Sequence, residues 1–286
     1  MVRNRMLDKL ATAVLWAAGL CILLILSWFL IRILGKGIPH LTPKFLFGKP
    51  EEIVAGGGIG PQIFNSFYIL FLSMLFSMPI GIGAGIYLAV YAKANRFTEL
   101  IRISVEALSS VPSIVFGLFG ALLFVNLLGF KFSILAGACT LALLNLPVLV
   151  SVTETALRSV PRHYFDASLA MGSTRWQAIW NVLLPAALPV LITGVTLVAG
   201  RALGESALLI FTAGTSVSRF FPDFNPLAMG EALAVHIWYA NSISLAPDGK
   251  QIAEGSSAAL VLIVLMINLL IAIPSRWLEK NMAGKK

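Results

Sequence analysis

Long uncharged stretches are the feature that most limits what this chain can fold into. No charged residue occurs between Lys9 and Arg32, for example, and similar apolar intervals recur to the C-terminal end. Each interval is long enough for the roughly 20 helical residues that cross a bilayer. Helices are expected because the hydrocarbon core offers no hydrogen-bond partner to an open backbone. The intervals predict six membrane-spanning helices, at 11–32, 64–91, 107–128, 132–153, 190–211 and 257–275.

Composition supports a membrane protein and excludes a soluble one. Charged residues make up 12% of the chain and hydrophobic residues 58%, whereas soluble domains carry about 25% charged residues. A barrel is excluded because its strands would be alternating segments of about 10 residues. The first interval exceeds the roughly 7–15 apolar residues of a signal-peptide core and lacks an Ala-x-Ala site, so we expect a retained helix. The predicted fold class is an all-α integral membrane protein.

The distribution of Lys and Arg predicts the orientation. With both termini in the cytoplasm, the inner segments 1–10, 92–106, 154–189 and 276–286 hold 13 basic residues, and the outer segments hold 7. This bias follows the positive-inside rule. The net charge of +8 is therefore explained by topology. No cluster of basic and aromatic residues supports nucleic-acid binding.

The inner segment 154–189 is the longest charge-bearing amphipathic interval between spans. Apolar residues recur at near-helical spacing from Phe165 to Trp180, so one face is expected to pack. Pro161 favours a helix that starts just after it. Gly172 reads as a helix stop, with Ser173 or Thr174 able to cap the next helix. The pattern predicts two short helices that meet at Gly172 on the inner face of the membrane.

These residues resemble the "EAA" loop of ABC importer permeases. Asp166-Ala167-Ser168, then Gly172, then Leu184-Pro185 keep that loop's register, although Asp166 and Ser168 replace the usual Glu and Ala. In that family the segment is the coupling helix that docks into a groove on a cytoplasmic ATPase. The resemblance implies that docking involves eight positions: Tyr164, Phe165, Asp166, Ala167, Ser168, Met171, Gly172 and Pro185.

The fifth predicted span carries two charges. Arg201 lies about ten residues into it, and a charged residue at that depth costs roughly 2.5–3.5 kcal/mol on insertion scales. Glu205 follows four residues later, so the two side chains are expected on one helical face as a pair. Such a pair either fixes helix packing or lies in a substrate path, and we favour the path. An Arg guanidinium suits a tetrahedral oxyanion.

Two further runs resemble the permeases of phosphate importers, PstA type. They are Pro112–Gly120, in which Pro112 predicts a kink or a wet point near the inner surface, and Gly200–Gly214. The second run has Ser206 and Leu208 where the family commonly has Thr and Pro. Without that Pro the helix is expected to run further. The resemblance places Arg201, Glu205 and Ser206 in the translocation path.

The resemblance also divides the chain. Residues 1–61 are expected to form an N-terminal transmembrane helix and an outer loop. Residues 62–275 form the permease domain of the type I ABC importer fold, which contains the coupling loop 154–189, and residues 276–286 form a basic cytoplasmic tail. The protein is expected to be multi-pass in the cell inner or plasma membrane.

Catalytic and metal chemistry have no sequence support. No Lys is followed by Ser or Thr, so a Walker phosphate-binding motif is excluded. Cys21 and Cys139 lie inside predicted spans, and His40, His163 and His236 lack ligand-spaced neighbours, so no disulfide or metal site is expected. The chain is therefore expected to be a transport subunit and not an enzyme.

The leading hypothesis is a permease subunit of an ATP-driven phosphate importer. The implied partners are a homologous second permease subunit, two copies of a cytoplasmic ATPase, an external phosphate-binding protein, phosphate and membrane lipid. No cofactor is expected on this chain, because ATP and magnesium would bind the ATPase. One alternative is a permease of the same fold for molybdate or phosphonate. Another is a secondary transporter, which should show internal repeats that the sequence lacks.

Overall fold

The computed structural model describes residues 2–51, 54–217 and 221–282. These residues form twelve α-helices, short π-helical turns and one 3-10 turn, and the only β-pairing among them is an isolated bridge between Val217 and Gly230. The helices are α1 (Val2–Gly37), α2 (Pro43–Phe47), α3 (Gly60–Ile86), α4 (Arg96–Ser109), α5 (Ser113–Gly120), α6 (Ile134–Ser159), α7 (Arg162–Ala170), α8 (Arg175–Ala178), α9 (Leu184–Leu203), α10 (Ala207–Thr212), α11 (Leu233–Ser242) and α12 (Gly249–Met282). The 3-10 turn is Ile38–His40, and the π-helical turns are Tyr87–Tyr91, Ala121–Leu127 and Ile179–Leu183.

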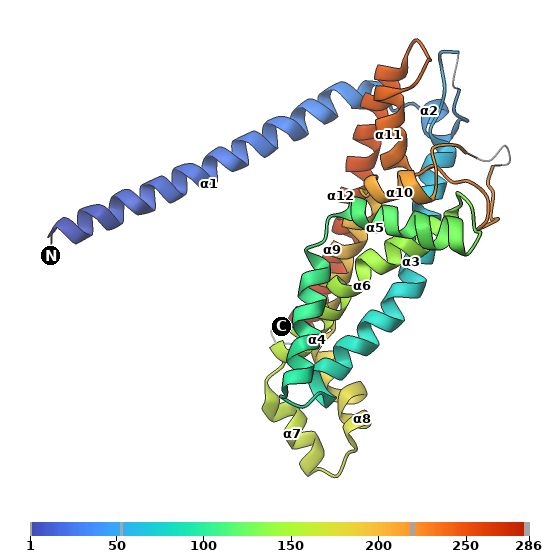
Figure 1. The fold of residues 1–286 in the computed structure, drawn as a ribbon. Coiled ribbons are helices and arrows are strands. Elements are labelled where there is room, and N and C mark those ends of the chain that lie inside the picture. Colours follow the sequence, from blue (N-terminus) through green and yellow to red (C-terminus); the bar gives the residue numbers. More distant parts are fainter. Residues whose placement is uncertain (1, 52–53, 218–220, 283–286) are drawn as a thin grey trace.

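The long helices form a bundle with two distinct ends. Figure 1 shows α7 and α8 at one end, and α2 and α11 at the other. The short helices α7 and α8 belong to the segment predicted to be cytoplasmic, so we call their end the inner end and the opposite one the outer end. Helix α6 lies at the centre and packs against α3 and α9. Gly81 permits close approach there, since a Cβ on it would lie 2.7 Å from Cβ of Leu149.

Helix α1 extends away from the bundle (Figure 1). Its membrane-length window is the most apolar of the candidate spans, yet none of that window is buried within the chain. The apolar side chains therefore face lipid or another subunit, and α1 contacts the rest of the chain at its C-terminal end.

The prediction of six spans is confirmed, but two of them have a different shape. Five helical segments are long and apolar enough to cross a membrane, and the sixth candidate is the pair α4 and α5, which meet at 94°. The prediction of one span at 107–128 is therefore wrong in its form. The helix begins earlier, at Arg96, and breaks at Ser110–Pro112, because Pro112 lacks an N–H group and restricts the residue before it.

The other changed span is the fifth. It was predicted to run from 190 to 211, with the helix continuing through Leu208, but α9 ends at Leu203 and α10 starts at Ala207. Gly204 caps α9, and its N–H donates to the carbonyl of Arg201 at 3.1 Å. The direction of α10 is fixed by burial, since Leu208 and Leu209 lie in the core with Leu141 and Val235. The break therefore forms without a proline.

The predicted tail 276–286 falls partly outside the described residues, at 283–286. Its described part, 276–282, continues α12.

Candidate coupling and translocation sites

The coupling segment folds as the sequence predicts up to the turn at Gly172, but the prediction of a second short helix is wrong. Helix α8, the π-helical turn Ile179–Leu183 and α9 form one continuous helix of 29 residues, Arg175–Leu203. Pro161 precedes α7, and α7 ends before Gly172, whose φ of +87° is in the region that favours glycine. Thr174 then caps α8: its Oγ1 accepts from N of Gln177 at 3.3 Å, while Oε1 of Gln177 accepts from N of Thr174 at 2.9 Å. This reciprocal capping box fixes the start of α8 next to the turn.

A second tie closes the turn between α7 and α8. The Oγ of Ser173 donates to the carbonyl of Ser168 at 2.6 Å and also lies 2.6 Å from Oγ of Ser168. Because Ser168 and Ser173 belong to opposite sides of the turn, the pair holds Gly172 at the tip. Ser168, which stands where ABC importer permeases usually have Ala, thus stabilises the turn through its contacts with Ser173.

Only part of the expected apolar face is packed. Phe165 packs against the inner core cluster that includes Leu157, Ile179 and Leu183, and so anchors α7 to the bundle. Trp176 and Trp180, in contrast, are 60% and 47% exposed, and the prediction that they pack is wrong. Their rings contact each other instead, with centroids 5.4 Å apart.

The inner end carries an exposed apolar patch. Met171 is 89% exposed and Tyr164 is 52% exposed, beside Asp166 and Ala167, which are also exposed. Figure 1 places α7 and the turn after it at the tip of the inner end, beyond the packed helices. An exposed apolar patch rimmed by polar residues marks a protein interaction site.

Two grooves flank α7. One, of about 540 Å³, is lined by Tyr164 and Pro185 together with Val160 and Asn181. The other, of about 610 Å³, is lined by Phe165 and Asp166 with two arginines, Arg158 and Arg162. The structure therefore brings Tyr164 together with Pro185, and places Asp166 on the other side of the helix.

The Arg201 region lies at the break between α9 and α10. Arg201 is in the last turn of α9 and is exposed on the isolated chain, while Ala202 and Leu203 beside it are buried. The predicted Arg201–Glu205 pair is not formed: among the described residues, neither side chain makes an ion pair or hydrogen bond. Spacing of four residues aligns side chains only within a continuous helix, and Glu205 lies after the helix has ended.

The two broken spans meet at this level. A Cβ on Gly117 of α5 would lie 2.7 Å from Cα of Leu208, so α5 and α10 pack backbone to backbone. Irregular backbone at membrane depth is tolerated where protein buries it or water reaches it. Arg201 is exposed in the single chain, and contact with lipid would penalise its charge.

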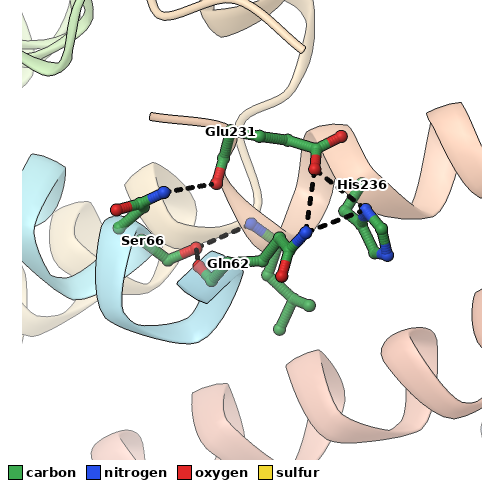
Figure 2. A network of polar contacts seen from close by, with 6 residues as sticks. Gln62, Ser66, Glu231 and His236 are labelled. Carbon is green, nitrogen blue, oxygen red and sulfur yellow. Dashed lines mark hydrogen bonds and ion pairs between the residues drawn. The ribbon is translucent and has the colours of Figure 1, made fainter. Parts of the chain in front are cut away.

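A buried polar network at the outer end was missed from the sequence. Figure 2 shows Gln62 of α3, His236 of α11 and Glu231, which precedes α11, meeting at one point. Oε2 of Glu231 accepts from Nε2 of Gln62 at 3.0 Å and lies 2.9 Å from Nδ1 of His236, and all three residues are buried. His236 was expected to be an isolated loop or interfacial residue, and that expectation is wrong.

The network extends into the backbone next to it. Oγ of Ser66 donates to the carbonyl of Gln62 and accepts from N of Leu233, each at 2.8 Å (Figure 2). Nδ2 of Asn65 donates to the carbonyl of Glu231 at 3.2 Å. The first turns of α3 thus hold the segment that leads into α11, and the contacts span 166 to 174 residues of sequence. No local pattern predicts contacts of that range.

We also searched the described residues for groups of side chains that could hold a metal ion. Within the described ranges, no group of three or more His, Cys, Asp or Glu side chains is placed to hold a metal ion.

Comparisons with known proteins identify the family. Residues 81–284 match the family described as "Binding-protein-dependent transport system inner membrane component". The chain is 45% identical over 287 residues to a probable ABC transporter permease, YqgI, of Bacillus subtilis, covering 97% of this chain and 96% of that one. It is 35% identical over 246 residues to the phosphate transport system permease PstA of Haemophilus influenzae, covering 85% of each.

Solved structures show the same fold. An inward-facing MetNI methionine ABC transporter matches with a TM-score of 0.61 at 21% identity, over 76% of this chain and 94% of that chain. A bacterial alginate ABC transporter, solved with an alginate pentasaccharide-bound periplasmic protein, matches with a TM-score of 0.64 at 14% identity, over 96% and 95%. The chain therefore belongs to the binding-protein-dependent transport inner membrane components, as an integral membrane permease with the type I ABC importer fold.

Proposed function

We propose that this chain is a permease subunit of an ATP-driven phosphate importer. The observation that carries the proposal is the similarity to PstA permeases, at 35% identity over 85% of the chain, which includes Arg201 and the coupling segment in one polypeptide. The family membership gives the transport role, and phosphate is the part that we add. The sequence lacks a Walker phosphate-binding motif, so we assign the supply of energy to a separate ATPase.

The coupling segment is the proposed contact with that ATPase. Met171 and Tyr164 present apolar surface, Asp166 adds a charge, and Gly172 sets the turn that exposes them. Phe165 ties α7 to α6 and α9 through the inner core. A displacement of α7 by the ATPase is therefore passed to α9, the helix that carries Arg201.

Arg201 is the proposed contact for the oxyanion in the path. Its guanidinium offers several N–H donors in a planar fork, which matches a phosphate. Glu205 and Ser206 follow in the break, where the backbone is no longer helical. We propose that a second, homologous permease subunit covers this face, and that an external phosphate-binding protein delivers the substrate to the outer end. No cofactor is assigned to this chain; ATP and magnesium belong to the ATPase.

Uptake of radiolabelled phosphate by the assembled complex in proteoliposomes tests the proposal. We expect unlabelled phosphate to compete, and excess molybdate or phosphonate to compete weakly. Arg201→Gln should lower uptake by about tenfold or more, the effect of losing a charge-assisted hydrogen bond, and Arg201→Lys should retain part of it. Stronger competition by molybdate or phosphonate than by phosphate would reassign the substrate. Unchanged uptake by assembled Arg201→Gln complexes would remove Arg201 from the path.

A further inference from the structure

A separate cavity of about 630 Å³ lies at the outer end, between the C-terminal part of α1 and helices α11 and α12. This volume is within the range of small-molecule sites. Ser206, at the break before α10, forms part of its wall. The cavity is distinct from the coupling segment and from Arg201, neither of which lines it.

The charges around this cavity are mostly positive. Arg32, Lys36 and Lys250 line it, and Glu254 is the one carboxylate among its lining residues. Nζ of Lys36 lies 3.4 Å from Oε1 of Glu254, so these two charges offset each other. Arg32 and Lys250 have no carboxylate partner within the described part of the chain. Two uncompensated cations thus face one space.

Neutral donors accompany those cations. Ser206, Asn241 and Ser242 line the same cavity, and their side chains form no hydrogen bond among the described residues. Arg32 is held in place by Trp28, because its guanidinium carbon lies 5.4 Å from the centre of that ring. The cavity therefore offers cationic and neutral donors together, which is the donor set that a phosphoryl group accepts.

The remaining wall is apolar apart from Ser257, whose Oγ donates to the carbonyl of Ala253 at 2.7 Å. Its apolar residues include Phe29 and Ile33 of α1 and Ile237 and Trp238 of α11. Trp and basic side chains in this arrangement are typical of the bilayer interface, where the polar part of a site meets headgroups and the apolar part meets acyl chains. The site is therefore amphipathic: its polar part suits a phosphoryl group, and its apolar part suits acyl chains.

We infer that this cavity binds a phosphoryl group, with Arg32 and Lys250 as its charged contacts and Ser206, Asn241 and Ser242 as neutral donors. The group has two sources with the same chemistry: the headgroup of an anionic phospholipid, and inorganic phosphate. The phospholipid source is independent of the proposed transport function. The phosphate source rests on it, since phosphate bound beside Ser206 would stand at the outer side of the proposed path.

Binding to the purified complex distinguishes these sources. In one arm, nanodiscs of phosphatidylcholine with added phosphatidylglycerol are analysed by native mass spectrometry, which counts the phosphatidylglycerol retained. In the other arm, nanodiscs of pure phosphatidylcholine are equilibrated with radiolabelled inorganic phosphate without ATP. Retention of phosphatidylglycerol alone assigns a lipid site, and binding of phosphate alone assigns an outer phosphate site.

Charge variants link either signal to the cavity. Arg32→Gln and Lys250→Gln should each weaken binding about fivefold, the effect of one basic residue near a charged surface. Glu254→Gln should strengthen it, because it removes the carboxylate and frees Lys36. Lys44→Gln changes an exposed basic residue of α2 that does not line this cavity, and it should have no effect.

The inference would be overturned if the complex bound neither ligand. It would also be overturned if the Arg32, Lys250 and Lys44 variants bound the ligand with the same affinity. ATP-driven phosphate uptake is measured on the same preparations. Loss of the binding signal with intact wild-type uptake would reject only this site. Retained phosphatidylglycerol without ATP-driven uptake would reject only the proposed function.

Discussion

Nε of Arg102 lies 2.9 Å from Oε1 of Glu154, and this ion pair joins α4 to α6 near the inner end. Arg158, one turn further along α6, approaches the same oxygen at 2.8 Å. Arg102 also donates to the carbonyl of Leu88, in the π-helical turn after α3, at 3.2 Å. Three elements are thus joined through Arg102 and Glu154, whose side chain is only 13% exposed and which is the first residue of the inner segment 154–189.

Replacing Glu154 tests this junction. Glu154→Gln should destabilise the protein by about 1–3 kcal/mol, because it leaves two arginines without their partly buried partner. Thermal unfolding of the purified protein in detergent measures the change. Glu99→Gln is the matched control, since Glu99 is 64% exposed and 3.7 Å from Arg102, and an exposed pair of that kind contributes below about 1 kcal/mol. Equal effects of the two variants would contradict the assignment.

The turn at Gly172 gives a second prediction. Nothing lies near a Cβ added there, so the cost of a side chain comes from the backbone at φ +87°. Gly172→Val should cost about 1–2 kcal/mol or more, reshape the turn and reduce ATPase retention during purification. Gly172→Asn should retain the ATPase, because Asn tolerates this conformation. If both variants retain it fully, the turn does not control docking.

Met171 tests the contact surface itself. Truncating an anchor at the centre of an interface costs about 1 kcal/mol or more, so Met171→Ser should weaken ATPase binding by about fivefold or more, without a change in thermal stability. Leu245→Ser is the control: Leu245 is 83% exposed, close to the 89% of Met171, but follows α11 at the outer end. Binding is measured by titrating purified ATPase onto the immobilised permease. Equal binding by both variants would place the contact elsewhere.

The outer network predicts a stability effect far from the coupling segment. Glu231→Gln removes the carboxylate that both Gln62 and His236 contact, in a site where all three side chains are buried. We expect destabilisation of about 1–3 kcal/mol by thermal unfolding. Glu106→Gln, at an exposed position of α4 outside this network, should leave stability unchanged. A Glu231 variant as stable as the Glu106 variant would show that the network does not hold α11.

Local signals account for what the sequence predicted well. Pro161, Gly172 and Thr174 act on their own neighbours, so the start of α7, its end and the cap of α8 could be read directly. The length of each apolar run is also a local property of the sequence, and it identified the membrane spans. The ends of α9 could not be read in this way, because α10 is oriented by burial of Leu208 against α5 and not by a residue in the break.

Contacts between distant segments account for what was missed. Gln62 and His236 are 174 residues apart, and each alone looks like an ordinary polar residue of an outer loop or helix end. Glu154 likewise meets Arg102 from 52 residues away. The prediction of an Arg201–Glu205 pair was wrong because it relied on a local signal, the spacing of four residues in a continuous helix. Tertiary packing interrupts that helix after Leu203.

Phosphate uptake with and without the ATPase tests the central claim most directly. The permease subunits are reconstituted in proteoliposomes with the external phosphate-binding protein, and labelled phosphate is followed in the presence of ATP. We predict that uptake requires both the ATPase and hydrolysable ATP. Uptake that continues at the same rate after the ATPase is omitted would contradict the claim that this chain is driven through the segment around Gly172.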